Sequence, residues 1–177
     1  MKNIIAFAGS SSNTSINKDV ASYAANLLDN VKVNLLDLND FKLPLYDIDL
    51  ENEQGIPKNA LTFLDYIKSS DGIVLSLAEH NGAYSAVFKN LYDWMSRAEK
   101  NVWFNKPMLL MAAAPGGRGG QSVLEIAQEK FPRMGANIID VFSLPFFNKN
   151  FVDGKIIDEE LDTLLKQAVS KFSIAIK

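Results

Sequence analysis

Short apolar segments alternate with longer amphipathic segments along this chain of 177 residues. The apolar segments lack a polar face, which is typical of strands that are covered on both sides of a sheet. Five such strands are predicted, at Lys2–Ala8, Val31–Leu36, Ile73–Leu77, Met108–Ala113 and Asn137–Phe142.

Helical periodicity fills the intervals between these strands. Apolar residues recur every three or four positions, as at Ile16, Val20 and Leu27, which places them on one face of a helix. The spacing predicts helices over residues 15–28, 57–68, 84–99, 122–131 and 159–176. The pair Asp153-Gly154 predicts a hairpin within residues 151–157. Residues 37–54 are predicted to be irregular and to wrap one edge of the fold.

Strands that alternate with helices predict a parallel sheet with helices on both faces. Because crossovers between parallel strands are nearly always right-handed, few topologies remain. The common solution for five strands is a flavodoxin-like α/β three-layer sandwich with strand order 2-1-3-4-5. The chain contains no internal repeat or linker, so we expect residues 1–177 to form a single domain.

Composition removes several classes of function. The net charge of −3 and the pI of about 5.2 argue against a nucleic-acid partner, which would normally need a basic face. The absence of cysteine excludes disulfides, thiolate nucleophiles and thiolate metal sites. Because His80 is the one histidine, we expect no multi-histidine metal site and no metal.

The apolar runs are too short for membrane targeting. Ile4–Ala8 is shorter than the apolar core of a signal peptide, which spans about 7–15 residues. The longest run, Met108–Ala114, is far below the roughly 18 residues of a membrane span. We therefore expect a cytoplasmic protein without a membrane partner.

Three loops with unusual composition follow strands one, three and four, whose carboxyl ends share one edge of the predicted sheet. The first, Gly9–Asn17, is rich in serine, asparagine and threonine and leads into a helix. A phosphate at such a place meets unpaired backbone N–H groups and the positive end of the helix dipole. Serine and asparagine also serve as ordinary helix caps and turn formers, so a purely structural role stays open.

The other two loops carry polar groups beside glycine. Ala78–Ala83 contains Glu79, His80 and Asn81, which can bond the polar edge of a heterocycle or simply form a turn and a cap. Pro115–Gly120 holds four glycines, which suit either a flat ligand lying against bare backbone or a flexible loop. Arg118 either reaches an anionic ligand group or lies in solvent. Together the three loops predict a crevice for a phosphorylated planar ligand.

Three segments resemble the flavodoxin-like NAD(P)H-dependent FMN reductase family, which includes quinone, azo-dye and chromate reductases. Ala6–Asn17 (AFAGSSSNTSIN) is similar to that family's first loop, Gly-Ser-x-Arg-x-x-Ser-x-Asn. Glu79–Arg97 (EHNGAYSAVFKNLYDWMSR) resembles its Pro-Glu-Tyr-Asn-Gly-Ser segment and the Lys-Asn-x-x-Asp-Trp helix. Lys106–Gly120 (KPMLLMAAAPGGRGG) resembles its fourth strand and glycine loop.

The resemblance implies FMN as cofactor, with its phosphate at the first loop and its isoalloxazine ring at the other two. The residues implied at the phosphate are Ser10, Ser12, Asn13, Ser15, Ile16 and Asn17. Those implied around the ring are Ala78, Glu79, His80, Asn81, Gly82, Ala114, Pro115, Gly116, Gly117 and Arg118.

This chain departs from the family pattern at three positions. Ser12 stands where the family has arginine, which removes a positive charge from the phosphate site and predicts weaker FMN binding. Ala78 and His80 replace the usual proline and tyrosine, which removes an aromatic ring from the surroundings of the flavin.

The resemblance implies that NADPH or NADH passes hydride to FMN, which then reduces a small acceptor such as a quinone, an azo compound, a metal oxyanion or free flavin. The flavin would carry the chemistry, so no catalytic side chain is needed. Water or His80 would supply protons. The alternatives left open are an FMN-binding electron carrier and a binding domain without nicotinamide turnover.

Two other classes conflict with the sequence. A phosphoacceptor domain needs an acidic residue at the end of strand one, where this chain has Ala8-Gly9. A serine hydrolase based on Ser10 needs a histidine late in the chain, which is absent.

The helix over residues 84–99 has an unusually wide apolar face. Its large apolar residues span an arc of about 160°, whereas packing on one sheet needs about 100°. These residues are Tyr84, Val87, Phe88, Leu91, Tyr92, Trp94 and Met95. The surplus width predicts a homodimer, with a tetramer as a further possibility. The alternative is that Tyr92 and Trp94 are covered within the same chain, under Trp103-Phe104.

Overall fold

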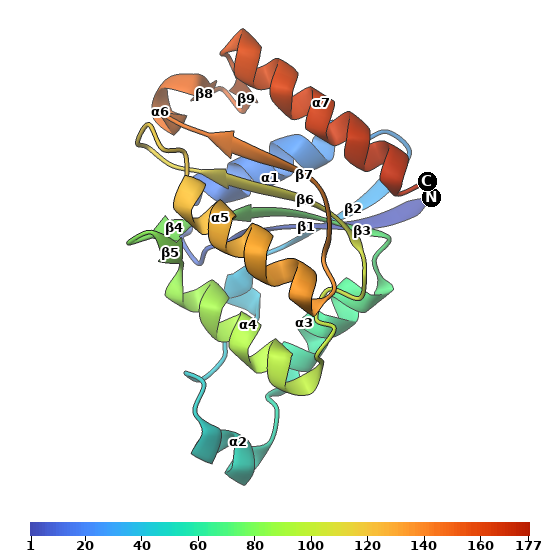
Figure 1. The fold of residues 1–177 in the computed structure, drawn as a ribbon, viewed down its shortest axis with the longest axis vertical. Coiled ribbons are helices and arrows are strands. Elements are labelled where there is room, and N and C mark those ends of the chain that lie inside the picture. The colour runs from blue at the N-terminus through green and yellow to red at the C-terminus, as the bar shows by residue number, and fades with distance from the viewer.

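A five-stranded parallel sheet lies at the centre of the computed structural model, which describes residues 1–177 (Figure 1). Its strands are β1 (Lys2–Gly9), β2 (Val31–Leu36), β3 (Gly72–Leu77), β6 (Pro107–Ala113) and β7 (Asn137–Leu144). The order is β2-β1-β3-β6-β7, and every neighbouring pair is parallel. The predicted flavodoxin-like order of 2-1-3-4-5 is therefore confirmed.

Helices cover both faces of this sheet and enclose two separate cores (Figure 1). The helices are α1 (Ile16–Asn26), α2 (Ile48–Gln54), α3 (Lys58–Ser69), α4 (Ala86–Ala98), α5 (Gln121–Lys130), α6 (Phe147–Asn150) and α7 (Glu159–Ala175). One core lies between the sheet and α3, α4 and α5, and the other lies between the sheet and α1 and α7. All of β3 is buried, which explains why its sequence has no polar face.

Short side chains at the helix starts explain where the helices begin. The hydroxyl of Ser15 accepts a hydrogen bond from the Lys18 N–H and caps α1, and Ser85 caps α4 in the same way. The Asp158 carboxylate accepts from the N–H of Leu161 at 3.0 Å and caps α7. The predicted hairpin at Asp153-Gly154 is present as β8 (Phe151–Val152) and β9 (Lys155–Ile156).

Several short elements of the structure were not predicted. Residues 37–54, predicted to be irregular, contain the 3-10 helix η1 (Leu38–Asp40) and α2. The loop after β3 forms a small antiparallel hairpin of β4 (Glu79–His80) and β5 (Ala83–Tyr84). The short helix α6 follows β7, and a second 3-10 helix, η2 (Phe131–Met134), follows α5. The helices among them are too short to show a clear period in the sequence.

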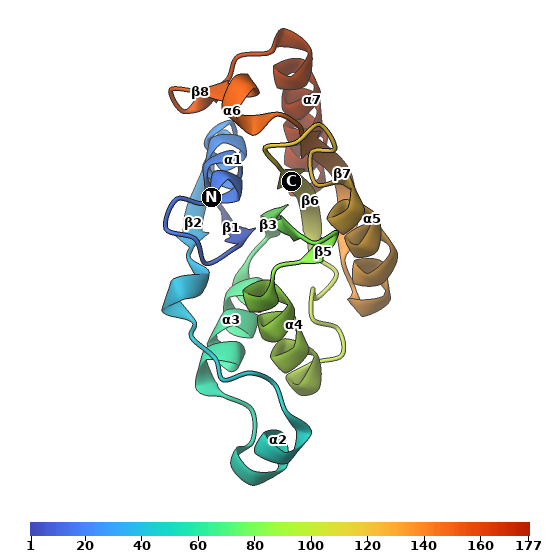
Figure 2. The same ribbon diagram turned by 90° about the vertical axis from the view of Figure 1, so that its left-hand side faces the viewer.

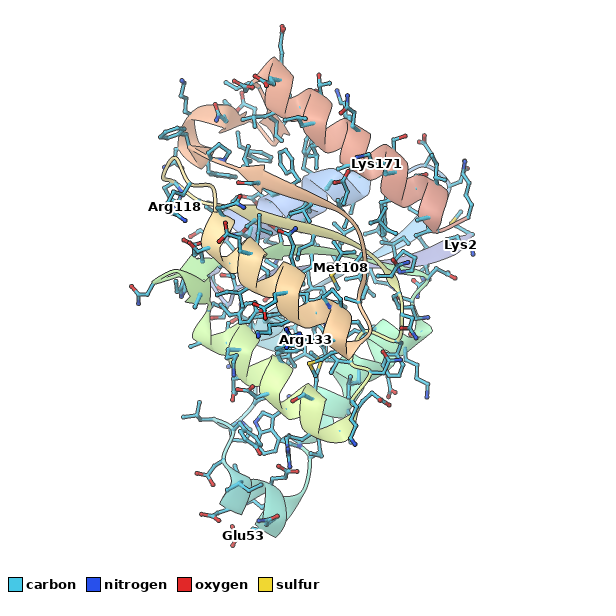
Figure 3. All side chains as sticks on the ribbon, viewed as in Figure 1. Lys2, Glu53, Met108, Arg118, Arg133 and Lys171 are labelled. Atoms are coloured by element: carbon cyan, nitrogen blue, oxygen red, sulfur yellow. The ribbon has the colours of Figure 1, made fainter.

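Residues 42–57, which we call the α2 lobe, project from the rest of the molecule (Figure 1). α2 buries none of its own residues, and Glu53 lies at the tip of the lobe (Figure 3). Side chains of α4 hold the lobe in place. The Asn90 amide and the Trp94 indole N–H both donate to the Pro44 carbonyl, at 2.9 and 2.8 Å. The lobe is therefore anchored by specific hydrogen bonds rather than by a core of its own.

The wide aromatic face of α4 is covered within the same chain. Trp94 is fully buried, with the ring of Tyr46 edge-on at 5.0 Å. Tyr92 packs against Trp103 and Phe131, with ring centroids 5.8 and 5.4 Å away. The alternative, that Tyr92 and Trp94 are covered within the same chain, is therefore confirmed, because the α2 lobe and the segment before β6 supply the covering groups. The width of this face no longer argues for a second subunit, and the homodimer stays a prediction. No helix of the structure has both the length and the apolar character needed to cross a membrane.

The two buried tryptophans allow a matched test of how the α2 lobe is anchored. Trp94→Phe removes a donor that reaches the Pro44 carbonyl, whereas Trp103→Phe removes a buried indole N–H that has no partner. We expect Trp94→Phe to lower the free energy of unfolding by about 1 kcal/mol more than Trp103→Phe. It should also speed tryptic cleavage within residues 42–57. Urea denaturation and limited proteolysis measure both effects, and equal behaviour of the two variants would contradict this anchoring.

Candidate functional site

A cleft of about 200 Å³ opens at the carboxyl edge of the sheet. Figure 2 faces this edge and shows the loop after β1, the β4–β5 hairpin and the loop after β6 coming together. The chain order of the strands reverses between β1 and β3, so this is the switch point at which doubly wound sheets bind ligands. The lining residues are Ser10, Ser12, Thr14, Ser15, Ile16, Asn17, Ala78, Glu79, His80, Ala113, Ala114 and Pro115.

The loop after β1 presents main-chain donors to the cleft. Two of its hydroxyl oxygens accept hydrogen bonds within the loop, since the Ser12 N–H donates to Ser10 Oγ and the Thr14 N–H donates to Ser12 Oγ. The N–H groups of Ile16 and Asn17, in the first turn of α1, have no acceptor in the protein. Free N–H groups at the positive end of a helix dipole are suited to an anion.

No basic side chain of α1 compensates for the serine at position 12. Lys18 forms an ion pair with Asp37 at 2.5 Å, on the neighbouring strand's loop. The hydrogen bond from Lys18 holds the pKa of the Asp37 carboxyl below its usual value. The anion-binding character of this end of the cleft therefore comes from the main chain and the helix dipole.

Asn17 points its side chain into the protein rather than into the cleft. The residue is only 3% exposed, and both atoms of its amide are hydrogen-bonded to Ala113 and Ser76. The resemblance implied Asn17 as a phosphate ligand. We therefore assign that role to its main-chain N–H, because both the nitrogen and the oxygen of the buried amide are already bonded to β3 and β6.

The loop after β3 is a two-residue hairpin. Asn81 and Gly82 both have positive φ, 51° and 76°, and they join β4 to β5. Asn-Gly is the strongest short-range signal for such a turn, so the sequence contained the information to predict it. Ala78, Glu79 and His80 line the cleft, whereas Asn81 and Gly82 lie beyond it at the exposed tip.

Glu79 lines the cleft and also caps a helix. One of its carboxylate oxygens accepts a hydrogen bond from the Val123 N–H at 3.0 Å, in the first turn of α5. The cap residue of that helix is Gly120, which has no side chain to fill the role. The carboxylate therefore satisfies a helix-terminal N–H and interacts favourably with the dipole of α5.

The titratable groups of the hairpin offer one candidate for proton transfer. His80 is exposed and has no carboxylate partner. Tyr84, at the end of β5, stacks on Phe131 with ring centroids 5.9 Å apart. Burial raises the pKa of Tyr84 well above its usual value, so its hydroxyl keeps the proton at neutral pH.

Close packing and positive φ angles within the protein account for most glycines in the loop after β6. A Cβ at Gly117 would lie 2.7 Å from the Phe146 ring, and a Cβ at Gly120 would lie 2.6 Å from that of Ala112. Gly119 and Gly120 also have positive φ, which favours glycine. Of the four, only at Gly116 would a Cβ meet no atom within 4 Å, so space remains there for a ligand to approach the backbone.

Ala114 and Pro115 line the cleft, whereas Gly116, Gly117 and Arg118 lie outside its lining. The Arg118 guanidinium is exposed and donates to the Ser122 hydroxyl at 3.1 Å, and Figure 3 shows it at the periphery. Asn13 is likewise exposed and outside the lining. The structure therefore groups most predicted residues in one cleft and leaves these at its rim.

Sequence reasoning missed several residues around the cleft. Thr14 and Ala113 are part of its wall. Ser85 donates its hydroxyl hydrogen to the Gly9 carbonyl at 2.7 Å and so fixes the start of α4 against the end of β1. Its position just before a helix signals a cap, but nothing in the local sequence signals the contact with Gly9.

A more enclosed hollow of about 300 Å³ lies on the α4 side of the first loop. Its walls are mainly apolar, and its amide groups are already paired. Asn90 bonds to the main chain at Tyr46 and Pro44, and Asn39 bonds to Ser11 and Asp37. Because a ligand site needs free polar groups to orient its ligand, we regard the cleft as the better candidate.

The chain is thus a doubly wound α/β protein with free helix-terminal N–H groups at its switch point, where this fold binds ligands. A family model described as NADPH-dependent FMN reductase matches residues 2–154. The chain therefore belongs to the NADPH-dependent FMN reductase family.

Named relatives are similar over part of their length. The quinone reductase of Escherichia coli (strain K12) is 33% identical over 78 residues, which are 44% of this chain and 42% of that protein. The NADPH azoreductase of Bacillus sp. (strain OY1-2) is 33% identical over 120 residues, 68% of this chain and 63% of that protein. The chain thus spans less than two thirds of either relative in these alignments.

Solved structures share the fold over nearly the whole chain. The NAD(P)H:(acceptor) oxidoreductase FerB from Paracoccus denitrificans matches with a TM-score of 0.78 and 24% identity, covering 99% of this chain and 97% of that one. The NADH:FMN oxidoreductase EMOB in its apo form matches with a TM-score of 0.73 and 15% identity, covering 100% and 91%. At these identities the likeness shows the fold alone.

Two glycines of the loop after β6 should respond differently to the same substitution. Gly120→Ala forces a Cβ into Ala112 at a positive φ, so we expect it to lower the free energy of unfolding by about 1–3 kcal/mol. Gly116→Ala places its Cβ in open space and should leave that free energy nearly unchanged. Urea denaturation measures the free energy of unfolding of both variants. A Gly116→Ala protein that is clearly destabilised would show that the space beside Gly116 is not open in solution.

Proposed function

We propose that this chain binds FMN in the cleft and passes hydride from NADPH or NADH, through the flavin, to a small electron acceptor. The single observation that carries the proposal is the cleft at the switch point, with the unpaired N–H groups of Ile16 and Asn17 at one end. Membership of the NADPH-dependent FMN reductase family supports it. Acceptors of the quinone, azo, metal-oxyanion or free-flavin kind fit this chemistry.

The residues present suit the phosphate of FMN. We assign the phosphate to the main-chain N–H groups of Ile16 and Asn17, with the loop residues Ser10, Ser12, Asn13 and Ser15 around it. A phosphate needs several hydrogen-bond donors, and a helix N-terminus supplies them without a basic side chain. The absence of an arginine at position 12 makes this site depend on neutral donors.

The ring end of FMN would lie against the other two loops. We place the isoalloxazine ring along the backbone of Ala78, Glu79 and His80 and of Ala114–Gly117, where Gly116 leaves open space. Asn81, Gly82 and Arg118 would lie at the outer rim. Because Glu79 accepts a hydrogen bond from α5 and the Tyr84 hydroxyl is buried, His80 is the exposed titratable side chain of the hairpin, and we assign it any proton donation from this loop.

Bound FMN would supply the hydride chemistry, so this chain needs no nucleophile. Its residues bind and orient: the first loop would hold the phosphate, and the main chain of the other loops would meet the polar edge of the ring. This division of tasks suits a chain with no cysteine and a single histidine.

We further propose a single FMN-binding domain over residues 1–177, a cytoplasmic location and a homodimer, with a tetramer as a larger assembly. The cleft of about 200 Å³ is small beside the roughly 300–1,000 Å³ typical of a cofactor pocket. Leu45 and Ile48 of the α2 lobe are exposed, at 80% and 49%. Both features are consistent with a second chain that completes the site, and sedimentation of a monomer at micromolar concentration would contradict the dimer.

The proposed activity is tested with the purified full chain, stoichiometric FMN and each nicotinamide. We expect FMN to remain bound after dialysis, its yellow absorbance to fade when NADPH or NADH is added without oxygen, and the colour to return when a quinone is supplied. No uptake of FMN by calorimetry would overturn the cofactor assignment. Bound FMN that neither nicotinamide bleaches would indicate an electron carrier instead.

Restoring the charge at position 12 should strengthen FMN binding. Ser12→Arg adds a guanidinium that can make charge-assisted hydrogen bonds to a phosphate, so we expect FMN affinity to rise about tenfold at low salt and the gain to shrink as salt is added. Ser12→Gln, which is long and polar but uncharged, is the matched control and should change the affinity little. Fluorescence titration measures both, and equal effects of the two substitutions would contradict phosphate binding at this loop.

A further inference from the structure

Asn17 joins two of the site's loops through a buried hydrogen-bonded network. Its Nδ2 donates to the Ala113 carbonyl at 3.2 Å, and the Ala113 N–H donates to its Oδ1 at 2.8 Å. The amide thus both donates to and accepts from the main chain of Ala113, as the main chain of a neighbouring strand would. The Ser76 hydroxyl on β3 donates to the same Oδ1 at 2.7 Å.

The network is buried, and each of its side-chain nitrogen and oxygen atoms has a hydrogen-bond partner. Ser76 is 0% exposed and Asn17 is 3% exposed. Burying an amide and a hydroxyl in an apolar sheet face costs free energy unless every polar atom is paired, as these are. An apolar pair of residues would fill the same space, so the polar network achieves something besides filling the core.

The network joins a residue at the phosphate end of the proposed FMN site to a residue at its ring end. Asn17 stands in the first turn of α1, and its own main-chain N–H is one of the two free donors there. Ala113 is the last residue of β6, directly before Ala114 and Pro115 of the third loop. The side chain of Asn17 therefore ties the anion-binding end of the cleft to the end that faces the ring.

We propose that Asn17, held by Ser76, is a positioning residue that sets the spacing between the phosphate end and the ring end of the FMN site. The inference rests on the proposed function. A ligand that spans two subsites gains affinity only when their spacing matches its length. A ligand that uses one subsite is indifferent to that spacing.

This difference separates positioning from mere stabilisation. If the network only stabilised the fold, its removal would lower the free energy of unfolding, while the molecules that remain folded would bind FMN, riboflavin and phosphate as before. If it sets the spacing, FMN binding weakens, while riboflavin, which lacks the phosphate, and inorganic phosphate, which lacks the ring, keep their affinities.

The test compares Asn17→Ala and Ser76→Ala with a matched control. Ser70→Ala removes another buried serine, whose hydroxyl donates to the Ile67 carbonyl at 2.8 Å just before β3, at the opposite edge of the sheet. Dissociation constants for FMN and riboflavin are measured by fluorescence, and those for inorganic phosphate by ³¹P NMR. Circular dichroism shows which variants fold, and Ser76→Ala keeps the test available if Asn17→Ala does not.

We expect the preference for FMN over riboflavin to fall about tenfold in Asn17→Ala and a fewfold in Ser76→Ala. It should be unchanged in Ser70→Ala, and phosphate and riboflavin binding should be unchanged in all three. Ser76→Cys, which keeps a weaker donor in place, should restore part of the preference.

Three outcomes would overturn the inference. Folded Asn17→Ala and Ser76→Ala proteins that keep the wild-type preference would show that the network sets no spacing. An equal loss in Ser70→Ala would show a general effect of stability. A loss of phosphate binding in step with FMN would show that Asn17 shapes only the anion end. A wild-type chain that binds no FMN would instead overturn the proposed function, so the two failures are distinguishable.

Discussion

The cleft depends on buried and half-buried polar side chains that connect the strand-end loops to the rest of the fold through hydrogen bonds. Asn17 ties α1 to β6, Ser85 ties α4 to the end of β1, and Glu79 ties the β4–β5 hairpin to α5. In a parallel sheet these loops are separated by whole crossovers in the chain, so their convergence at one edge does not by itself fix their spacing. Paired buried polar groups do so, because their hydrogen bonds hold only over a narrow range of distances.

This arrangement divides the work between side chains and main chain. Glu79 and Asn17 of the cleft bond to the protein through their side chains, whereas the N–H groups of Ile16 and Asn17 are free donors. A site built from main-chain groups on rigid elements is preorganised, since its donors cannot rotate away. It also accommodates Ser12 in place of the family's arginine, because the helix dipole remains when the charge is absent.

The sequence predicted the large elements well because each is decided locally. The strand at Val31–Leu36 has the predicted bounds, and the helix predicted to begin at Ser15 begins one residue later with Ser15 as its cap. The short elements were not predicted, since α6 and η1 have too few residues to display a period. The β4–β5 hairpin is a different failure: Asn81-Gly82 carries a clear turn signal, but the loop was interpreted by its chemistry alone.

By itself, the sequence determined the order of strands and helices, the parallel sheet that this order requires, and the three loops at its carboxyl edge, because periodicity and turn residues act over short stretches. Only the tertiary structure decided which way each polar side chain faces. Asn17 and Ala113 lie 96 positions apart, and no local pattern shows that an amide in a serine-rich loop will find its partners there. The aromatic face of α4 makes the same point, since the α2 lobe that covers Trp94 becomes its neighbour only in the folded chain.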